Sequence, residues 1–456
     1  SAGYNESTGI ATVELKRVKD SEGQSDVVFG AYEEENGRKS LSSVQIEDEI
    51  NPQIGQTATV EKTITGDVID AFIWKSKESM IPLAKAINLK SNEQNNDFSE
   101  YVDFVVDVEE GREPVILQIT DTQIIDSSQR RTKSRISDTA IAYWKPDKMD
   151  ELCFDYLREV VAETKPDFII MTGDNVYGEF DDDGSCFKAL VDVMESFNIP
   201  WAPIYGNHDA ETALGVDWQC ARLENAPNCL FKQRTLTGNG NYSVGITQGG
   251  ELKRVFFMLD SNGAANISEK SLANGHSTAT RGFGQDQIAW YTAAAQKINN
   301  AYPGMKYSFA YHIPLTIAQE AIGRYQKVTE DNDSELIENL GKLDDGDFGY
   351  ICGGFNSKWD KDKIIYEGMK ALGCDSHFFG HEHTYSASVV YDGTRFQFGQ
   401  KSSDYDEINH MLADGTVKKG AATSNGTPMV GGTVMKMAQD GSFSDLHIHY
   451  CDGIIE

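Results

Sequence analysis

The chain has 456 residues, of which 39% are hydrophobic and 25% are charged, and its formal net charge is −30 at pH 7. This length favours two domains over one, and no stretch approaches the ~18 apolar residues that a transmembrane helix needs. The negative charge opposes binding to nucleic acid or to an anionic membrane, so neither is expected as a partner. An anionic small molecule can still bind where metal ions reverse the local field.

The seven cysteines give no C-x-x-C spacing, so the sequence offers neither a zinc knuckle nor a thioredoxin-like motif. Cys220 and Cys229 are close enough in sequence to pair, and free buried thiols are the alternative. The first residues, S-A-G-Y-N, lack the charged and apolar segments of a signal peptide. A secreted protein that has already been processed would begin in the same way.

The first 110 residues predict an all-β domain. Polar and β-branched or aromatic residues alternate over residues 57–65, 67–74 and 102–108, which is typical of half-buried strands. The stretch D-A-F-I-W-K-S-K-E-S-M-I-P-L-A (70–84) resembles the closing strands of immunoglobulin-like modules in secreted bacterial proteins. That resemblance implies an immunoglobulin-like accessory domain over residues 1–110. It also implies an extracellular or cell-surface location in a bacterium, with the cytoplasm as the alternative.

From Pro114 onward the pattern changes to alternating strands and helices. Short apolar runs at 115–119, 167–171 and 201–205 predict buried strands, and apolar residues recur at helical spacing over 149–161 and 187–197. Right-handed β-α-β connections place the carboxyl ends of such strands along one edge of a sheet. The sequence therefore predicts an α/β domain over residues 111–456.

Polar residues that bind metals follow five of the apolar runs. Carboxylates can bridge two cations, imidazoles can fix each ion, and neutral amide oxygens can complete the coordination shell. Glycines precede Asp174, Asn207 and His381 and allow the tight turns that such a site needs. The candidate ligands are Asp121, Gln123, Asp174, Asn207, His312, His381 and His383, with His208 and Asp209 beside them.

The order of these motifs resembles that of the calcineurin-like metallophosphoesterases. The motifs are G-D (173–174), G-N-H-D (206–209) and G-H-E-H (380–383), with Asp121 before them and His312 between the last two. The segments Y-G-N-H-D-A-E, A-Y-H-I-P-L and F-G-Q-K resemble the purple-acid-phosphatase-like branch more narrowly. The resemblance implies a four-layer α/β/β/α sandwich that binds two divalent or trivalent ions of iron, zinc or manganese at its strand ends.

The resemblance also implies a role for each residue. Asp174 would bridge the two metals; Asn207, His312 and His381 would complete one site, and Asp121 and His383 would hold the other. A metal-bridging hydroxide would attack the phosphorus atom. His208 would face the substrate and either protonate the leaving oxygen or stabilise the transition state, with Asp209 orienting the imidazole.

Gln123 departs from the family pattern. The family commonly reads D-x-H where this chain reads D-T-Q (121–123), and a carboxamide oxygen is a weaker donor than an imidazole. Tyr177 is a candidate replacement, because G-D-x-x-Y in purple acid phosphatases supplies a tyrosine ligand to ferric iron. The sequence allows three interpretations of the first metal site: coordination by Gln123, coordination by Tyr177, or a centre reduced to one metal.

These features favour a metal-dependent hydrolase of small phosphoesters. One alternative is a phosphodiesterase that acts on a nucleotide or a lipid headgroup, since the same centre serves both chemistries. The other is a catalytically weak surface protein that binds metal or phosphate. The presence of His208 and Asp209 favours an enzyme, because a purely structural metal site needs neither residue.

Overall fold

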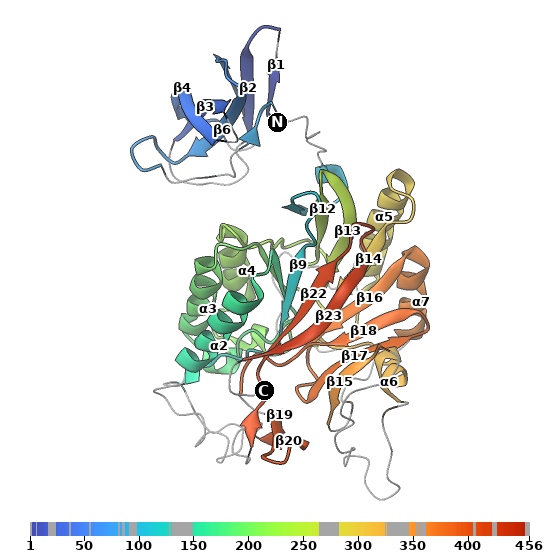
Figure 1. Cartoon of the computed structure of the whole chain (residues 1–456). Coiled ribbons are helices and arrows are strands. Elements are labelled where there is room, and N and C mark those ends of the chain that lie inside the picture. Colours follow the sequence, from blue (N-terminus) through green and yellow to red (C-terminus); the bar gives the residue numbers. More distant parts are fainter. Residues whose placement is uncertain are drawn as a thin grey trace, which may run out of the picture. The chain divides into compact units, whose positions relative to one another are not determined.

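The chain forms two compact units, Ser1–Asn96 and Asp97–Glu456 (Figure 1). The computed structural model describes all residues except 1, 6, 17–23, 36–37, 54–55, 81–82, 84–86, 91–97, 127–128, 130–148, 264–281, 324, 326–345, 353–354, 356–361, 405–406, 422–425 and 452–456. Among the described residues, no helix is long and apolar enough to span a bilayer. All seven cysteines are buried and none forms a disulfide, so Cys220 and Cys229 do not pair.

The described residues of the first unit form only strands and irregular segments, as the alternating pattern predicts. One sheet has the order β1-β2-β5, with β1 (Ala2–Asn5), β2 (Ile10–Lys16) and β5 (Thr57–Thr63). The other has the order β4-β3-β6-β7, with β4 (Arg38–Ile50), β3 (Ser25–Glu35), β6 (Val68–Trp74) and β7 (Ile87–Asn88). Val13, Phe29, Val60 and Ile69 belong to the hydrophobic core of this unit.

The second unit contains a five-stranded sheet with the order β11-β10-β9-β22-β23. These strands are β11 (Trp201–Pro203), β10 (Phe168–Met171), β9 (Val115–Ile119), β22 (Gly431–Met437) and β23 (Phe443–Tyr450). Strands β9, β10 and β11 run parallel, as expected from the predicted β-α-β-α-β order. The connecting helices are α2 (Met149–Thr164) and α3 (Ser185–Ser196), and α4 (Val216–Asn225) follows β11.

An eight-stranded sheet with the order β15-β17-β18-β16-β14-β13-β12-β8 forms the other half of this unit. Its strands are β15 (Phe348–Ile351), β17 (Tyr385–Tyr391), β18 (Thr394–Phe398), β16 (Cys374–Phe379), β14 (Lys306–Ala310), β13 (Glu251–Met258), β12 (Tyr242–Gln248) and β8 (Phe104–Val108). The helices of this half are α5 (Gln285–Ala301), α6 (Ile317–Ile322) and α7 (Asp362–Leu372). After β18 the chain forms a small three-stranded sheet of β19 (Glu407–Met411), β20 (Val417–Ala421) and β21 (Thr427–Pro428).

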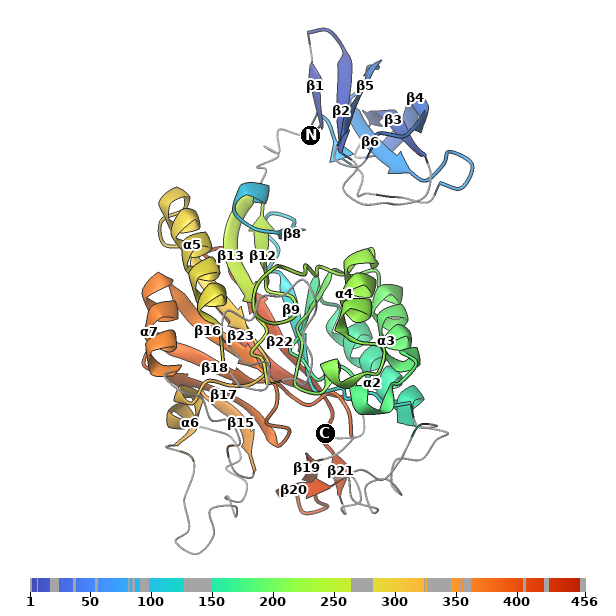
Figure 2. The same ribbon diagram turned by 180° about the vertical axis from the view of Figure 1, so that it is seen from behind.

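Side chains join the two sheets of the second unit. The rings of Phe168 on β10 and Phe256 on β13 meet at 5.9 Å between centroids, and Gln118 on β9 donates to the carbonyl of Phe379 on β16 at 3.2 Å. Both views show α2, α3 and α4 together beside the five-stranded sheet, and α5 and α7 beside the eight-stranded one (Figures 1 and 2). The unit is a mixed α/β structure whose core lies where the sheets meet.

The division between the units lies earlier than residue 110, where the sequence predicts it. Strand β8 pairs in parallel with β12, so residues 104–108 belong to the eight-stranded sheet. Just before β8, the buried carboxylate of Asp103 binds Lys232 at 2.6 Å and Arg234 at 2.5 Å. The prediction placed β8 in the wrong domain because its alternating pattern is the same as that of the N-terminal strands.

We expect a chain of residues 97–456 to fold, and one of residues 112–456 to be clearly less stable. The shorter chain lacks β8, whose Val106 and Val108 are buried, and burying a valine contributes about 1.5–3 kcal/mol, so the loss of both corresponds to a Tm lower by roughly 10 °C. Thermal unfolding of the two truncated proteins measures this difference. Equal Tm values would mean that β8 adds nothing to the second unit.

Candidate metal centre

Five strands from two sheets deliver the predicted ligands to one place. Asp121 and Asp174 follow β9 and β10, and Asn207 follows β11, all in the five-stranded sheet. His312 and the pair His381 and His383 follow β14 and β16 of the eight-stranded sheet. The site therefore lies where the carboxyl ends of strands from both sheets meet, instead of at the edge of a single sheet.

Two groups of side chains in this place have the geometry of a metal site. The first, here called the His312 group, contains Asp174, His312 and His381, and the second, the His383 group, contains Asp121, Asp174 and His383. Within each group the candidate ligand atoms lie within 4.8 Å of one another. Asp174 belongs to both groups, which is the position of a bridging carboxylate.

Unpaired polar atoms test whether a cation fits here. Asp174 Oδ2, His312 Nε2 and Asn207 Oδ1 are buried, and none has a hydrogen-bond partner among the described residues. Asp174 Oδ2 and His312 Nε2 are 3.1 Å apart. Buried polar atoms are rarely left unpaired in proteins, and a carboxylate, an imidazole and an amide oxygen are all ligands of transition metals. The residues present therefore fit a metal ion.

Hydrogen bonds fix the ligands in orientation. His312 Nδ1 lies 2.8 Å from the carbonyl oxygen of Thr172, which directs Nε2 toward Asp174. The carboxylate of Asp121 accepts hydrogen bonds from Thr120 Oγ1 at 2.8 Å and from the backbone N–H of His381. Partners of this kind commonly set the tautomer and the direction of metal-binding side chains.

Left-handed backbone conformations are concentrated at this site. The φ angles of Asp121, Gln123, Asp174 and His381 are 51°, 43°, 50° and 70°. Non-glycine residues adopt such angles at a cost of about 1–3 kcal/mol each, and they cluster at functional sites. The strained residues lie where the backbone turns after a strand and directs a side chain into the cluster.

The glycines before the ligands are required by close contacts, as predicted from the sequence. A Cβ atom on Gly173 would lie 2.7 Å from His312 Nδ1. A Cβ atom on Gly206 would collide with the Asp174 side chain, and one on Gly380 with the Asp121 carboxylate. Any side chain at these three positions would therefore displace a candidate ligand.

The electrostatics of the cluster favour positive charge at its centre. Burial opposes ionisation of Asp174, but the nearby imidazoles of His312 and His208 outweigh it and hold the pKa of this carboxyl far below its usual range. Burial likewise opposes the charged form of His312, but the carboxylate of Asp174 raises the pKa of this imidazole to about 9. A proton on the His312 imidazole and a metal ion would therefore compete for the same place.

The family model for calcineurin-like phosphoesterases matches residues 114–385. The chain belongs to this family. The match covers all seven predicted metal ligands and His208, and members of the family bind two metal ions. The two ligand groups that share Asp174 are the candidates for those ions here.

The relatives include proteins named as purple acid phosphatases. "Probable inactive purple acid phosphatase 14" from Arabidopsis thaliana is 28% identical over 188 residues, which is 35% of this chain and 44% of the relative. "Phosphatase DCR2" from Saccharomyces cerevisiae is 27% identical over 135 residues, 27% of this chain and 23% of the relative. The chain thus spans less than half the length of these relatives.

Solved structures of phosphatases are also similar to the chain. Purple acid phosphatase PPD1 from yellow lupin matches with a TM-score of 0.42 and 10% identity, over 100% of this chain and 72% of that one. A dimetal phosphatase from Danio rerio matches with a TM-score of 0.39 and 9% identity, over 74% of this chain and 99% of that one.

Gln123, which departs from the phosphoesterase pattern, makes a contact that the sequence does not predict. Its Oε1 accepts a hydrogen bond from Nζ of Lys401 at 2.6 Å, and its Nε2 has no partner among the described residues. Lys401 also donates to the backbone carbonyl of Asp121 at 3.0 Å. The F-G-Q-K segment (398–401) marks the place of Lys401 in the sequence, but nothing in it points to Gln123.

His208 lies beside the metal-binding groups, with its backbone N–H donating to Asp174 Oδ1 at 2.8 Å. Its Nδ1 is 3.1 Å from Oε2 of Glu211, a residue absent from the sequence prediction. Its ring stacks on Tyr177 at 4.2 Å between centroids and an interplanar angle of 29°. This stacking accounts for the burial of Tyr177, whose role as a metal ligand stays a prediction.

Asp209 does not have the contact predicted for it. Its carboxylate accepts hydrogen bonds from the backbone N–H groups of Gly206 at 2.7 Å and Val176 at 2.9 Å, and from Asn175 Nδ2 at 3.2 Å. Burial and the neighbouring charge of Asp174 raise its pKa to about 7. Asp209 therefore braces the turn that carries Asn207, and Glu211 is the carboxylate that contacts the His208 ring.

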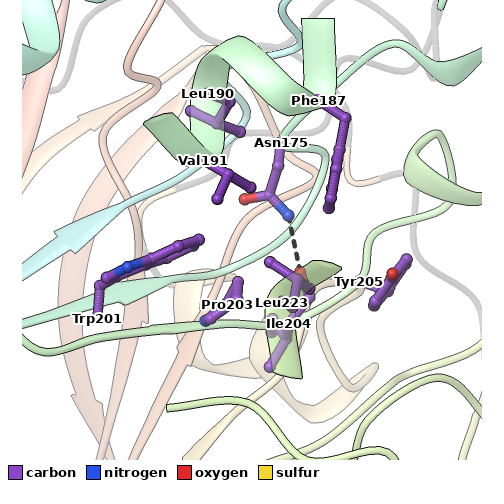
Figure 3. A pocket seen from close by; sticks show the side chains of 9 residues that line it. All are labelled: Asn175, Phe187, Leu190, Val191, Trp201, Pro203, Ile204, Tyr205 and Leu223. Carbon is purple, nitrogen blue, oxygen red and sulfur yellow. Dashed lines mark hydrogen bonds between the residues drawn. The ribbon is translucent and has the colours of Figure 1, made fainter. Parts of the chain in front are cut away.

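Asn175 links two of the loops that carry ligands. Its Nδ2 donates to the carbonyl of Ile204 at 2.9 Å, which joins the turn after β10 to the segment after β11 (Figure 3). The surrounding side chains include Trp201 and Tyr205 and enclose a cavity of only about 10 Å³. A space of this size is at the lower limit for one water molecule, so Trp201 and Tyr205 serve as packing here.

Glu211→Gln is expected to lower kcat by roughly 10-fold, a fraction of the 10²–10⁴ that a positioned acid contributes. The glutamine keeps the shape of the side chain but removes the charge that holds His208 Nδ1. Asp209→Asn is the matched comparison and should lower Tm instead, because each carboxylate oxygen accepts one backbone hydrogen bond and the NH₂ group of asparagine cannot accept one of them. Steady-state kinetics and thermal unfolding separate the two effects. A wild-type kcat in Glu211→Gln would remove Glu211 from the site.

Proposed function

We propose that residues 97–456 form a metal-dependent hydrolase of small phosphoesters. The observation that carries this proposal is the pair of ligand groups that share Asp174, with buried atoms left unpaired where a cation fits. Membership of the calcineurin-like phosphoesterase family supports it. When bound, the cations would polarise a phosphoryl oxygen and activate a water molecule at neutral pH.

Asp174 would hold the centre together, because it is the one carboxylate present in both groups. Asn207, His312 and His381 would complete the first site, and Asp121 and His383 the second. Iron, zinc and manganese all suit this mixture of carboxylate, amide and imidazole donors.

His208 would supply the proton to the leaving oxygen. Its side chain is 15% exposed, so the imidazole can reach a bound substrate and still be held from behind. Glu211 at Nδ1 and the stacked ring of Tyr177 fix its direction. A positioned imidazole of this kind contributes roughly 10²–10⁴-fold to turnover.

Two structural expectations belong to this proposal. The two sheets and the helices beside them would form the four-layer α/β/β/α sandwich of the family. The N-terminal all-β unit would be an immunoglobulin-like accessory module, consistent with an extracellular or cell-surface location. The whole protein's substrate and partners are likewise proposals, since the chain spans less than half the length of its named relatives.

A second candidate function is metal or phosphate binding with little turnover. The specific observation in its favour is that the Oε1 atom of Gln123 is bound by Lys401, at a position where the family commonly has an imidazole. Relatives whose names include "probable inactive" are compatible with such a role in this chain.

Metal-stripped protein reconstituted separately with Mn²⁺, Zn²⁺ or iron, and assayed on an aryl phosphate monoester and a bis-aryl diester, tests the proposal. We expect hydrolysis that depends on added metal, and the ratio of the two rates distinguishes a phosphatase from a phosphodiesterase. Protein that carries its full complement of each metal and cleaves neither ester would overturn the proposal in favour of the binding role.

A further inference from the structure

The orientation of the Gln123 carboxamide is fixed by its partner. Lysine side chains only donate hydrogen bonds, so the group 2.6 Å from Lys401 Nζ must be the carbonyl oxygen of Gln123. The reversed carboxamide would place two donors against each other. The Nε2 group then faces away from Lys401 without a partner among the described residues, and an NH₂ group cannot bind a cation.

Lys401 is held in this position by the segment that follows β18. Its side chain is 0% exposed, and its backbone forms a parallel bridge with Thr120. The N–H of Ser402 donates to the carbonyl of Thr120 at 3.0 Å, and Ser403 Oγ donates to the carbonyl of Asp121 at 3.2 Å. Backbone contacts therefore hold Lys401 beside Asp121, and its side chain does not reach in from the surface.

We propose that the Gln123–Lys401 pair takes the place of a metal ligand and makes the two cation sites unequal. The His312 group would bind its ion tightly, and the His383 group would bind weakly and exchange its ion. This inference rests on the metal centre of the proposed function.

The number of available ligands leads to this asymmetry. The His383 group contains Asp121, whose backbone carbonyl accepts from the Lys401 amine, and the oxygen that Gln123 could have supplied is already bound. With Asn207, whose buried Oδ1 has no hydrogen-bond partner among the described residues, the His312 group offers four candidate ligands, whereas the His383 group offers three.

Equilibrium competition between metal-stripped protein and a chromophoric chelator, with Mn²⁺ or Zn²⁺ as the probe, tests this directly. We expect two binding steps whose affinities differ by roughly 10–100-fold, the range by which partners of metal ligands commonly change affinity. His383→Ala should remove the weaker step and His381→Ala the stronger one. Two equal steps in the unmodified protein would overturn the inference without the need for any variant.

Four proteins then test the role of the pair. Gln123→His alone should change the weak step little, because Lys401 would still bind the new imidazole. The double variant Gln123→His, Lys401→Met should tighten the weak step by roughly 10-fold or more, whereas Lys401→Met alone should tighten it less. Lys419→Met, which removes an exposed lysine paired with Glu407, is the matched control and should change neither step. A double variant that folds and keeps the wild-type weak step would refute the role of the pair.

The result is independent of turnover. Unequal binding in a protein that hydrolyses no phosphoester would contradict the proposed function and support this inference. Equal binding at the two sites of an active enzyme would support the proposed function and contradict this inference.

Discussion

Asp174→Asn is expected to abolish hydrolysis, with a loss of roughly 10³-fold or more. Asp174 is the carboxylate common to both ligand groups, and it is buried among His312, His208 and Asp121. A neutral amide cannot balance two cations, and a bound metal supplies several kcal/mol of charge stabilisation in the transition state, each 1.36 kcal/mol being tenfold in rate. The measurement is kcat together with metal content.

Asp192→Asn is the control for the Asp174 prediction. It makes the same chemical change on the exposed face of α3, where Asp192 pairs with Arg222 at 2.8 Å, and it should leave rate and metal content unchanged. If Asp174→Asn kept more than a tenth of the wild-type rate with full metal content, Asp174 would not be the bridging ligand.

His208→Ala is expected to lower kcat by roughly 10²–10⁴-fold while the bound metal stays in place. The imidazole contacts Glu211 and Tyr177 and belongs to neither ligand group, so its removal leaves every candidate ligand present. Kinetics with a substrate that has a good leaving group should show a smaller loss, since such a group needs less protonation. Loss of metal in this variant would identify His208 as a ligand instead of an acid.

Most of the site could be predicted because each ligand follows an apolar strand. Asp121, Asp174, Asn207, His312 and His381 all come directly after short buried runs, and this local pattern specifies both the strand and its polar end. Parallel connections then place such ends together. Two sheets are expected only from the resemblance to the phosphoesterases; the strand pattern alone does not show which strands pair, because pairing depends on contacts far apart in the chain.

Two residues of the site could not be assigned from local patterns. Lys401 contacts Gln123 across 278 positions, and lysine is ordinarily an exposed residue, so its burial there has no local signal. Glu211 is only three residues from His208, but Asp209 is adjacent and was the simpler choice. In the 3₁₀ turn η4 (Asp209–Glu211), side chains three positions apart lie on the same face, which brings Glu211 to the imidazole and turns Asp209 inward.

The same limitation explains the misplaced boundary between the units. Residues 104–108 alternate like the strands of the first unit, and they belong to the second because β8 pairs with β12 about 140 residues further on. The ion pairs from Asp103 to Lys232 and Arg234 reinforce that pairing and join residues 129 and 131 positions apart.

The most direct test of the whole account is a metal titration of stripped protein in which bound metal and the rate of aryl phosphate hydrolysis are recorded together. We predict no turnover before metal is added, turnover that rises with metal occupancy, and neither binding nor turnover in Asp174→Asn. A full rate in metal-free protein, or no turnover once both sites are filled, would contradict a phosphoester hydrolase built on this centre.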